Sequence, residues 1–234
     1  MACSVTPALA GVVVASGDTN IIDPLTGRAV FSTIDTGNQR LFTNLLDTGT
    51  RVLIATSSIP GTTSDLSTFY NALPGKTASV RTGDVRAIDL IGIDLFISPA
   101  HDTAYSTTEL ATISAFSAAG GTVLVTGDWA TAYSPYNAIA NTLLDAVGGG
   151  LRIVDANDSG LPRTATGTAI TAHPLTSGVT TLSYNYTSRV TGGTTVVTNT
   201  AGFPFVTVVP EPAVSTLATG VLFCVRRRRG RLRS

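Results

Sequence analysis

The sequence predicts an α/β fold in which a doubly wound, parallel β-sheet carries helices on both faces, as a three-layer sandwich. Three observations lead to this prediction. Apolar runs typical of buried parallel strands begin or fill three segments, residues 51–61, 93–100 and 122–128. Each run is followed by apolar residues at helical spacing, and the connections between them are short. Strands that alternate with helices in this way form a parallel sheet covered on both faces.

The first elements of this pattern lie between residues 38 and 75. Residues 38–46 predict a helix, and residues 51–61 predict the strand that follows it, which stops at a Ser-Ser pair and a Pro-Gly pair. Ser64 is the expected cap of the next helix, and Pro74 and Gly75 end it. Its apolar residues recur at helical spacing, at Leu66, Phe69, Tyr70 and Leu73.

The next strand, at residues 93–100, precedes a helix with a strong start signal. Ser106 and Glu109 have the spacing of a capping box, in which each side chain bonds the other residue's backbone N–H. Gly120 and Gly121 end this helix, as glycine commonly does.

After the strand at residues 122–128, Ser134 is the expected cap of a further helix, with Pro135 at its first helical position. Residues 151–156 predict a fourth strand of the same sheet. Beyond residue 157 the chain is rich in Thr, Val and Gly with frequent turn signals, which predicts short strands added antiparallel at one edge. The α/β body is predicted to span residues 17–208.

Residues 1–16 allow two interpretations. Ala8-Leu9-Ala10 before Gly11 has the A-x-A pattern of a signal-peptidase site, but no basic residue precedes it. The segment could be the remnant of a signal peptide whose start lies further upstream, and this is the interpretation we favour. Alternatively, residues 11–16 are the first strand of the body.

The net charge of zero hides an uneven distribution. Six of the 15 basic residues lie after residue 225, so the remaining nine face all 15 acidic ones and give the rest of the chain a net charge of −6. Nucleic-acid binding needs a basic face on the fold, so an acidic body argues against it. The two cysteines, Cys3 and Cys224, lie at opposite ends and predict neither a disulfide framework nor a cysteine metal site.

The last 26 residues differ from everything upstream. Pro210-Glu211-Pro212 precedes an apolar run of 13 residues, 213–225, which ends at a block of arginines: Arg226, Arg227, Arg228 and Arg229. A comfortable membrane span takes about 20 residues, although snorkelling arginines and a thinned bilayer can shorten it. The arrangement predicts a short membrane segment with a stop-transfer signal. An amphipathic helix on the body is the alternative, but no periodic polar face supports it.

This tail resembles the PEP-CTERM sorting signal of Gram-negative bacteria, since the three parts occur in the same order at the extreme end. The resemblance implies an exported protein, held in the inner membrane through residues 213–225 and processed by an exosortase near Pro210-Glu211-Pro212. It also implies delivery to the cell surface or the extracellular matrix, where extracellular polysaccharide is the expected partner.

The body resembles class I glutamine amidotransferase-like domains, a flavodoxin-like architecture, through residues 109–128 and the turn at residues 173–179, "HPLTSGV". That family needs a nucleophilic cysteine on a sharp strand-to-helix turn, and neither cysteine lies in the body. No G-x-S-x-G occurs either. The departure argues against glutaminase activity, and we expect a body that is not catalytic and carries no cofactor and no metal.

Four residues are nevertheless candidates for an acid/base or metal site: His101, Asp102, Asp128 and His173. The first three follow strands, where α/β sheets place their ligands. Structural roles compete well, because the aspartates can cap loops and His173 can satisfy a tight turn. An envelope hydrolase or sugar-processing enzyme would bring His101, Asp128 and His173 together. A carbohydrate-binding module would expose three aromatic rings on one surface, those of Trp129, Tyr133 and Tyr136.

Overall fold

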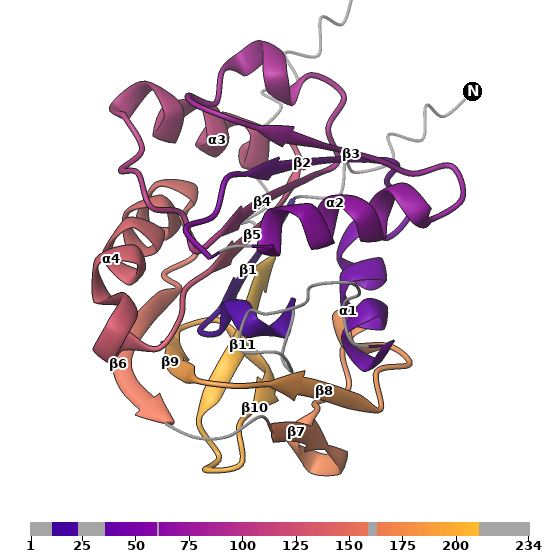
Figure 1. The fold of residues 1–234 in the computed structure, drawn as a ribbon, viewed down its shortest axis with the longest axis vertical. Helices are drawn as coiled ribbons and strands as arrows, with labels where there is room; N and C mark the ends of the chain where they lie inside the picture. The colour runs from indigo at the N-terminus through magenta and orange to yellow at the C-terminus, as the bar shows by residue number, and fades with distance from the viewer. Residues whose placement is uncertain (1–10, 23–35, 60, 159–162, 211–234) are drawn as a thin grey trace, which may run out of the picture.

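The computed structural model describes residues 11–22, 36–59, 61–158 and 163–210. Its centre is a seven-stranded sheet in the order β10-β11-β1-β5-β4-β2-β3 (Figure 1). Neighbouring strands from β1 to β3 are parallel, and β11 runs antiparallel to both β1 and β10. The strands are β1 Val12–Ser16, β2 Arg51–Ala55, β3 Thr77–Arg81, β4 Leu95–Pro99, β5 Thr122–Thr126, β10 Thr194–Thr198 and β11 Pro204–Pro210. The predicted α/β class with a mainly parallel sheet is confirmed.

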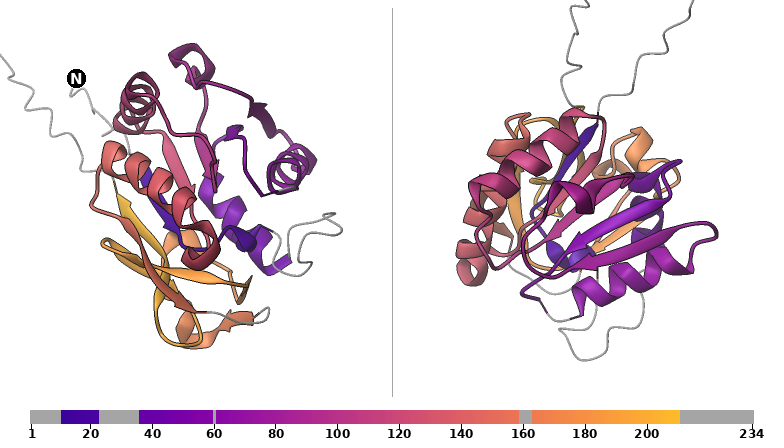
Figure 2. Two further views of the ribbon diagram at one scale, coloured as in Figure 1. Left: turned by 60° about the vertical axis from the view of Figure 1, so that its left-hand side comes forward. Right: turned by 90° about the horizontal axis from the view of Figure 1, so that it is seen from above.

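Helices cover both faces of this sheet (Figures 1 and 2). They are α1 Thr36–Leu46, α2 Thr62–Ala72, α3 Thr107–Ala118 and α4 Ala130–Val147. Successive strand residues point to opposite faces, so Val14 packs with α1 and α2 while Val13 packs with α3 and α4. Two buried apolar clusters result, one on each side of the sheet.

Local sequence signals account for some of the helix boundaries. The capping box at α3 is present as expected: Ser106 accepts from the Glu109 N–H, and Glu109 accepts from the Ser106 N–H. The prediction that Ser64 caps α2 is wrong, because α2 begins at Thr62 after Gly61, whose φ is 86°, and the Ser64 hydroxyl donates to the Gly61 carbonyl.

The helix expected to begin at Ser134 starts earlier. α4 begins at Ala130 with one turn after Trp129, and its backbone kinks at Tyr133, where φ is −122° and ψ is 18°. The regular part of the helix resumes after this kink. Pro135 therefore lies in its first turn, where the missing N–H costs little.

The predicted fourth parallel strand is the main error in topology. Residues 152–158 form β6, but β6 pairs antiparallel with β9 (Thr187–Thr191) in a separate sheet. Three glycines with positive φ, at 148–150, redirect the chain away from the main sheet before β6 begins. The parallel strand at the edge of the main sheet, next to β2, is β3.

The predicted antiparallel addition at one edge is confirmed by β10 and β11. A third sheet joins β7 (Arg163–Thr166) to β8 (Thr181–Tyr184). Short 3-10 helices complete the described chain: η1 Thr19–Ile21, η2 Ala87–Leu90, η3 Gly167–Ala169 and η4 Pro174–Thr176.

The first and last strands of the described body, β1 and β11, are paired with each other. β1 places Val12–Ser16 in the middle of the main sheet, so this segment is a strand of the body, which therefore begins before residue 17. In the register of β1 with β11, Val12 lies opposite Pro210. The Ala8-Leu9-Ala10 pattern and residues 211–234 lie outside the described residues. Within the part that is described, no helix is long and apolar enough to cross a membrane.

Candidate functional site

The strand order creates two switch points at the carboxyl edge of the sheet, the edge at which the parallel strands end. β1 and β2 lead to helices on one face, whereas β4 and β5 lead to helices on the other. β1 lies beside β5, and β2 lies beside β4. In both pairs, the connections that follow the two neighbouring strands lead to opposite faces of the sheet. Open α/β sheets bind their ligands at such switch points.

His101 lies at the β2/β4 switch point, just after β4 and beside the end of β2. The preceding residue, Ala100, is fully buried with a φ of 36°, and its carbonyl accepts from the Ser58 N–H at 3.2 Å and the Ser58 hydroxyl at 2.9 Å. His101 Nδ1 lies 2.7 Å from the Thr56 carbonyl oxygen. Because a carbonyl oxygen only accepts, Nδ1 carries the hydrogen, and Nε2 is the acceptor in the neutral ring. The ring stacks on Tyr105 at 4.6 Å between centroids.

Hydroxyl groups link the ends of β1 and β5 at the second switch point. The Oγ1 atoms of Thr19 and Thr126 lie 2.6 Å apart, and Thr19 donates to the Gly127 carbonyl at 2.8 Å. Thr126 also accepts from the Ala100 N–H at 3.1 Å. This buried chain of hydrogen bonds fixes three strand ends relative to one another.

Asp18 is the most perturbed acidic group at this edge. Its side chain is fully buried, and it accepts from the Asn20 N–H at 2.7 Å, the Asn20 amide at 2.9 Å and the Asn185 N–H at 2.8 Å. Burial raises the pKa of Asp18 to about 6 even though these hydrogen bonds lower it. The Asn20 amide also reaches Asp128 at 3.4 Å, so a single amide lies between two buried carboxyl groups.

Asp128 itself is held by the start of α4. Its N–H donates to Asn137 at 2.9 Å, its carbonyl accepts from the Asn137 amide at 2.8 Å, and its Oδ1 accepts from the Trp129 N–H at 2.6 Å. These bonds give Asp128 the loop-capping role that the sequence offered as the alternative to catalysis.

An aromatic pair lies next to this network. Trp129 stacks on Tyr186, which follows Asn185 in the β8–β9 turn, at 4.9 Å between centroids and an interplanar angle of 27°. Both rings are half-buried. Tyr133 and Tyr136 form a separate pair at 5.7 Å and are also half-buried. Trp129 therefore pairs with a residue distant in sequence, and the three rings considered from the sequence divide between two pairs.

The four candidate residues do not come together. His101 and Asp128 lie at different switch points of the carboxyl edge, and Asp102 is exposed and accepts from the Thr103 hydroxyl. His173 lies at the opposite, amino edge, where its Nδ1 accepts from the Leu175 N–H at 3.1 Å and caps η4. It lines a cleft of about 980 Å³ beside the starts of β2, β4 and β5. Among the described residues, no group of three or more His, Cys, Asp or Glu side chains could hold a metal ion.

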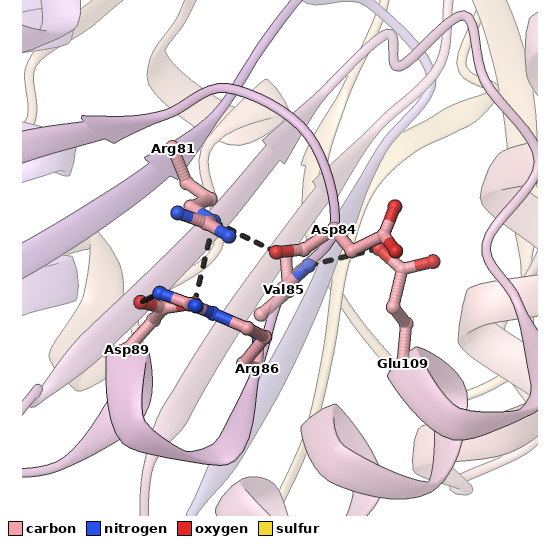
Figure 3. Close-up of polar contacts among 6 residues, drawn as sticks. All are labelled: Arg81, Asp84, Val85, Arg86, Asp89 and Glu109. Atoms are coloured by element: carbon pink, nitrogen blue, oxygen red, sulfur yellow. Dashed lines mark hydrogen bonds and ion pairs between the residues drawn. The ribbon is translucent and has the colours of Figure 1, made fainter.

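A charged cluster follows β3 and serves the crossover to η2 (Figure 3). Arg81 lies between Asp89, at 3.3 Å, and the Asp84 carbonyl, to which it donates at 2.7 Å. The Arg86 guanidinium lowers the pKa of Asp89 to about 2 through a hydrogen bond. Burial alone would raise the pKa of Glu109, but hydrogen bonds from Ser106 and the Val85 N–H outweigh it and lower that pKa. Both arginines pair with Asp89, and Glu109 is held by backbone and hydroxyl hydrogen bonds, so these groups stabilise the crossover.

Sequence reasoning missed Asp18, Asn20, Asn185 and Tyr186. The signal for Asp18 is present, because "GDTN" follows the apolar run at residues 12–16. It becomes visible once that run is recognised as a strand. The contribution of the β8–β9 turn depends on a contact between segments some 170 residues apart, which periodicity cannot reveal.

Comparisons with known proteins assign no family to this chain. No family model matches it, and no curated protein matches its sequence. A solved structure described as the mmIFT52 N-terminal domain is similar to it with a TM-score of 0.46 and 13% identity, over 62% of this chain and 76% of that one. Similarity at this level assigns neither family nor function.

Proposed function

We propose that this chain is an exported protein of the cell envelope or extracellular matrix, delivered by its C-terminal sorting signal, and that its α/β body binds rather than catalyses. The observation that carries the proposal is the order of parts after the last strand: Pro210-Glu211-Pro212, the apolar run at residues 213–225, and the arginines at 226–229. An arginine block after an apolar run stays on the inner side of a membrane.

The position of the last strand supports a separable tail. β11 ends at Pro210, so all seven strands of the main sheet are complete before Glu211. An exosortase that cut within or after the motif would leave the strands of the body in place. The body can then be released without losing a structural element.

The finer architecture also belongs to this proposal: a three-layer, doubly wound, amidotransferase-like domain. Helices on both faces support it, as do α3, Gly120-Gly121 and β5 in the expected succession. The "HPLTSGV" segment contains η4, a tight turn that begins after His173. The antiparallel strands β10 and β11 are then additions beside β1.

The strand ends support a body without catalysis. Of the described non-glycine residues, only Asp47 and Ala100 have a positive φ. Ala100 ends β4 at a sharp turn, the kind of position where hydrolases hold a nucleophile, but it carries only a methyl group. His101 is engaged by Thr56, and His173 lies at the other edge.

Fractionation of tail variants in a host that contains an exosortase tests the sorting proposal. Glu211→Ala should leave full-length chain in the inner membrane, because the motif is damaged while the anchor remains. Replacing Arg226–Arg229 with serine should reduce retention in that membrane. Glu109→Gln, within the body, is the matched control and should be processed normally. Normal processing and release of the Glu211→Ala and the arginine variants would reject the proposal.

A second candidate function is carbohydrate binding, favoured by the Trp129–Tyr186 pair beside Asp128. A half-buried aromatic face can stack on a sugar ring. Affinity electrophoresis in gels that contain the host's extracellular polysaccharide tests it. Trp129→Ala should abolish retardation while Tyr133→Ala, in the separate aromatic pair, retains it. Equal retardation of both variants and the wild type would exclude this site.

A further inference from the structure

We infer that the membrane-anchored chain is held in one orientation, with the amino edge of its main sheet against the lipid headgroups and the carboxyl edge pointing away. This inference rests on the proposed function, because it takes residues 213–225 as the anchor. It adds which surface of the body meets the membrane and which surface remains open to partners. Three observations carry it: the exit point of the tail, the length of the connection and the distribution of charge.

The tail leaves the body at the amino edge. The register of β1 with β11 sets Val12, where the first parallel strand begins, opposite Pro210, where the last strand ends. The two strands are neighbours in the sheet (Figure 1). Val12 also lines the cleft that is bordered by Thr50, Asp94 and Thr122, at or next to the starts of the other parallel strands. The anchor is therefore attached to the same edge as that cleft.

The connection is too short for the body to turn over. Only Glu211 and Pro212 separate Pro210 from the apolar run. Three peptide steps span at most about 11 Å, and proline restricts the backbone further. A five-residue strand such as β2 is about 17 Å long, so the carboxyl edge lies farther from the tail exit than the connection can reach.

The two edges also differ in net charge, and the difference favours the same orientation. The connections at the amino edge contain two basic and two acidic residues, a net charge of zero, in residues 47–51, 74–77, 91–95 and 119–122. Those at the carboxyl edge contain one basic and four acidic residues in residues 17–22, 56–61, 82–86, 100–106 and 127–130. Asp18 and Asp128 are buried, so the exposed residues there, Asp84, Asp102 and Arg86, give a net charge of −1. An anionic bilayer surface repels the acidic edge more strongly than the neutral edge.

The orientation determines which edge of the body ligands can reach while the chain is anchored. The cleft of about 980 Å³ that His173 lines opens at the edge that faces the headgroups. His101 and the Trp129–Tyr186 pair, which are half-buried, lie at the opposite edge. Ligands from outside the cell can therefore reach the carboxyl edge before the tail is cut.

Fluorescence quenching on vesicles tests the orientation. The full chain, with Cys3→Ser and Cys224→Ser, receives one cysteine at an exposed position of either edge, Thr48→Cys at the amino edge or Thr103→Cys at the carboxyl edge. Each labelled chain is reconstituted into vesicles of phosphatidylethanolamine and phosphatidylglycerol that contain a headgroup-attached quencher. We expect quenching to be several-fold stronger at position 48. Equal quenching, or stronger quenching at position 103, would overturn the inference.

A spacer variant shows whether the short connection causes the difference. Twelve Gly/Ser residues inserted between Pro212 and Ala213 have a root-mean-square span of about 19 Å, comparable with the length of the strands. The insertion should bring quenching at the two positions close together. A difference that survives the spacer unchanged would show that the tether does not orient the body.

Flotation of the same samples separates this inference from the proposal it rests on. A chain that floats with the vesicles and shows equal quenching has an anchor but no fixed orientation. A chain that does not float has no membrane anchor, which refutes the sorting proposal and the orientation with it.

Discussion

The Asp18 carboxyl group should make the folded chain less stable as the pH rises from about 4 to 6. Burial raises its pKa from 3.8 to about 6, so over this interval the folded state binds a proton that the unfolded state has released. Stability from such a group is present below the unfolded pKa and is lost as the pH rises through the folded one. At about 1.4 kcal/mol per pKa unit, the full loss is about 3 kcal/mol, and about 2 kcal/mol of it falls between pH 4 and 6, because the unfolded group is already partly ionised at pH 4 and the folded group is only half ionised at pH 6.

Urea unfolding at pH 4, 5, 6 and 7 measures this loss. The Asp18→Asn variant removes the titration. It also removes one acceptor, because an amide cannot accept from both Asn20 and the Asn185 N–H, at a cost of about 1 kcal/mol that is nearly independent of pH. The free energy of unfolding of the wild type should therefore fall relative to that of the variant by about 2 kcal/mol between pH 4 and 6.

Asp89→Asn is the matched control. Arg86 lowers the pKa of Asp89 to about 2, so the stability from this carboxylate is present above its ordinary pKa and is lost only as the pH falls toward 2. That variant should follow the wild type between pH 4 and 6. A wild-type stability that stays level with Asp18→Asn over this interval, or rises relative to it, would refute the reasoning about Asp18.

Three further substitutions test the packing around the sheet. Asn71→Ala should cost about 1 kcal/mol in urea unfolding, because Asn71 bonds both the N–H and the carbonyl of Ala78 on the edge strand β3, and light scattering should show increased association of the exposed edge. Gly17→Ala should cost about 2–3 kcal/mol, because a Cβ would lie 1.9 Å from the Ser188 carbonyl oxygen; a cost below about 0.5 kcal/mol would contradict the close approach. Glu109→Ala should lower stability by about 2 kcal/mol by thermal unfolding, because it breaks the capping box and leaves a buried N–H unpaired, and Glu109→Gln should cost less.

Periodicity and turn signals predicted the local elements well but not every pairing. Helices α1 to α4 and strands β2, β4 and β5 arise from apolar runs with strong boundary signals, such as the capping box of Ser106 and Glu109. β3 was missed because its five residues, TASVR, are mostly exposed or half-exposed and contain no apolar run. β6 has the apolar pattern of a parallel strand, but the turn through residues 148–150 sends it to β9.

The candidate site could be predicted only where one strand end determines it. His101 and Asp128 do lie at the carboxyl edge, since that follows from the strands before them. Their separation from His173 depends on where η4 packs, which is against α1 at the other edge. The burial of Asp18 and the contacts of Asn185 and Tyr186 come from the β8–β9 turn closing over the end of β1, a contact that no local signal encodes.

The intact mass of the protein recovered from the envelope and the medium of a native host tests the central claim most directly. The sorting account predicts a mass lower by about the last 24 residues, 211–234, and a body found outside the inner membrane. A full-length chain that remains in the inner membrane, with no shortened form in any fraction, would contradict it.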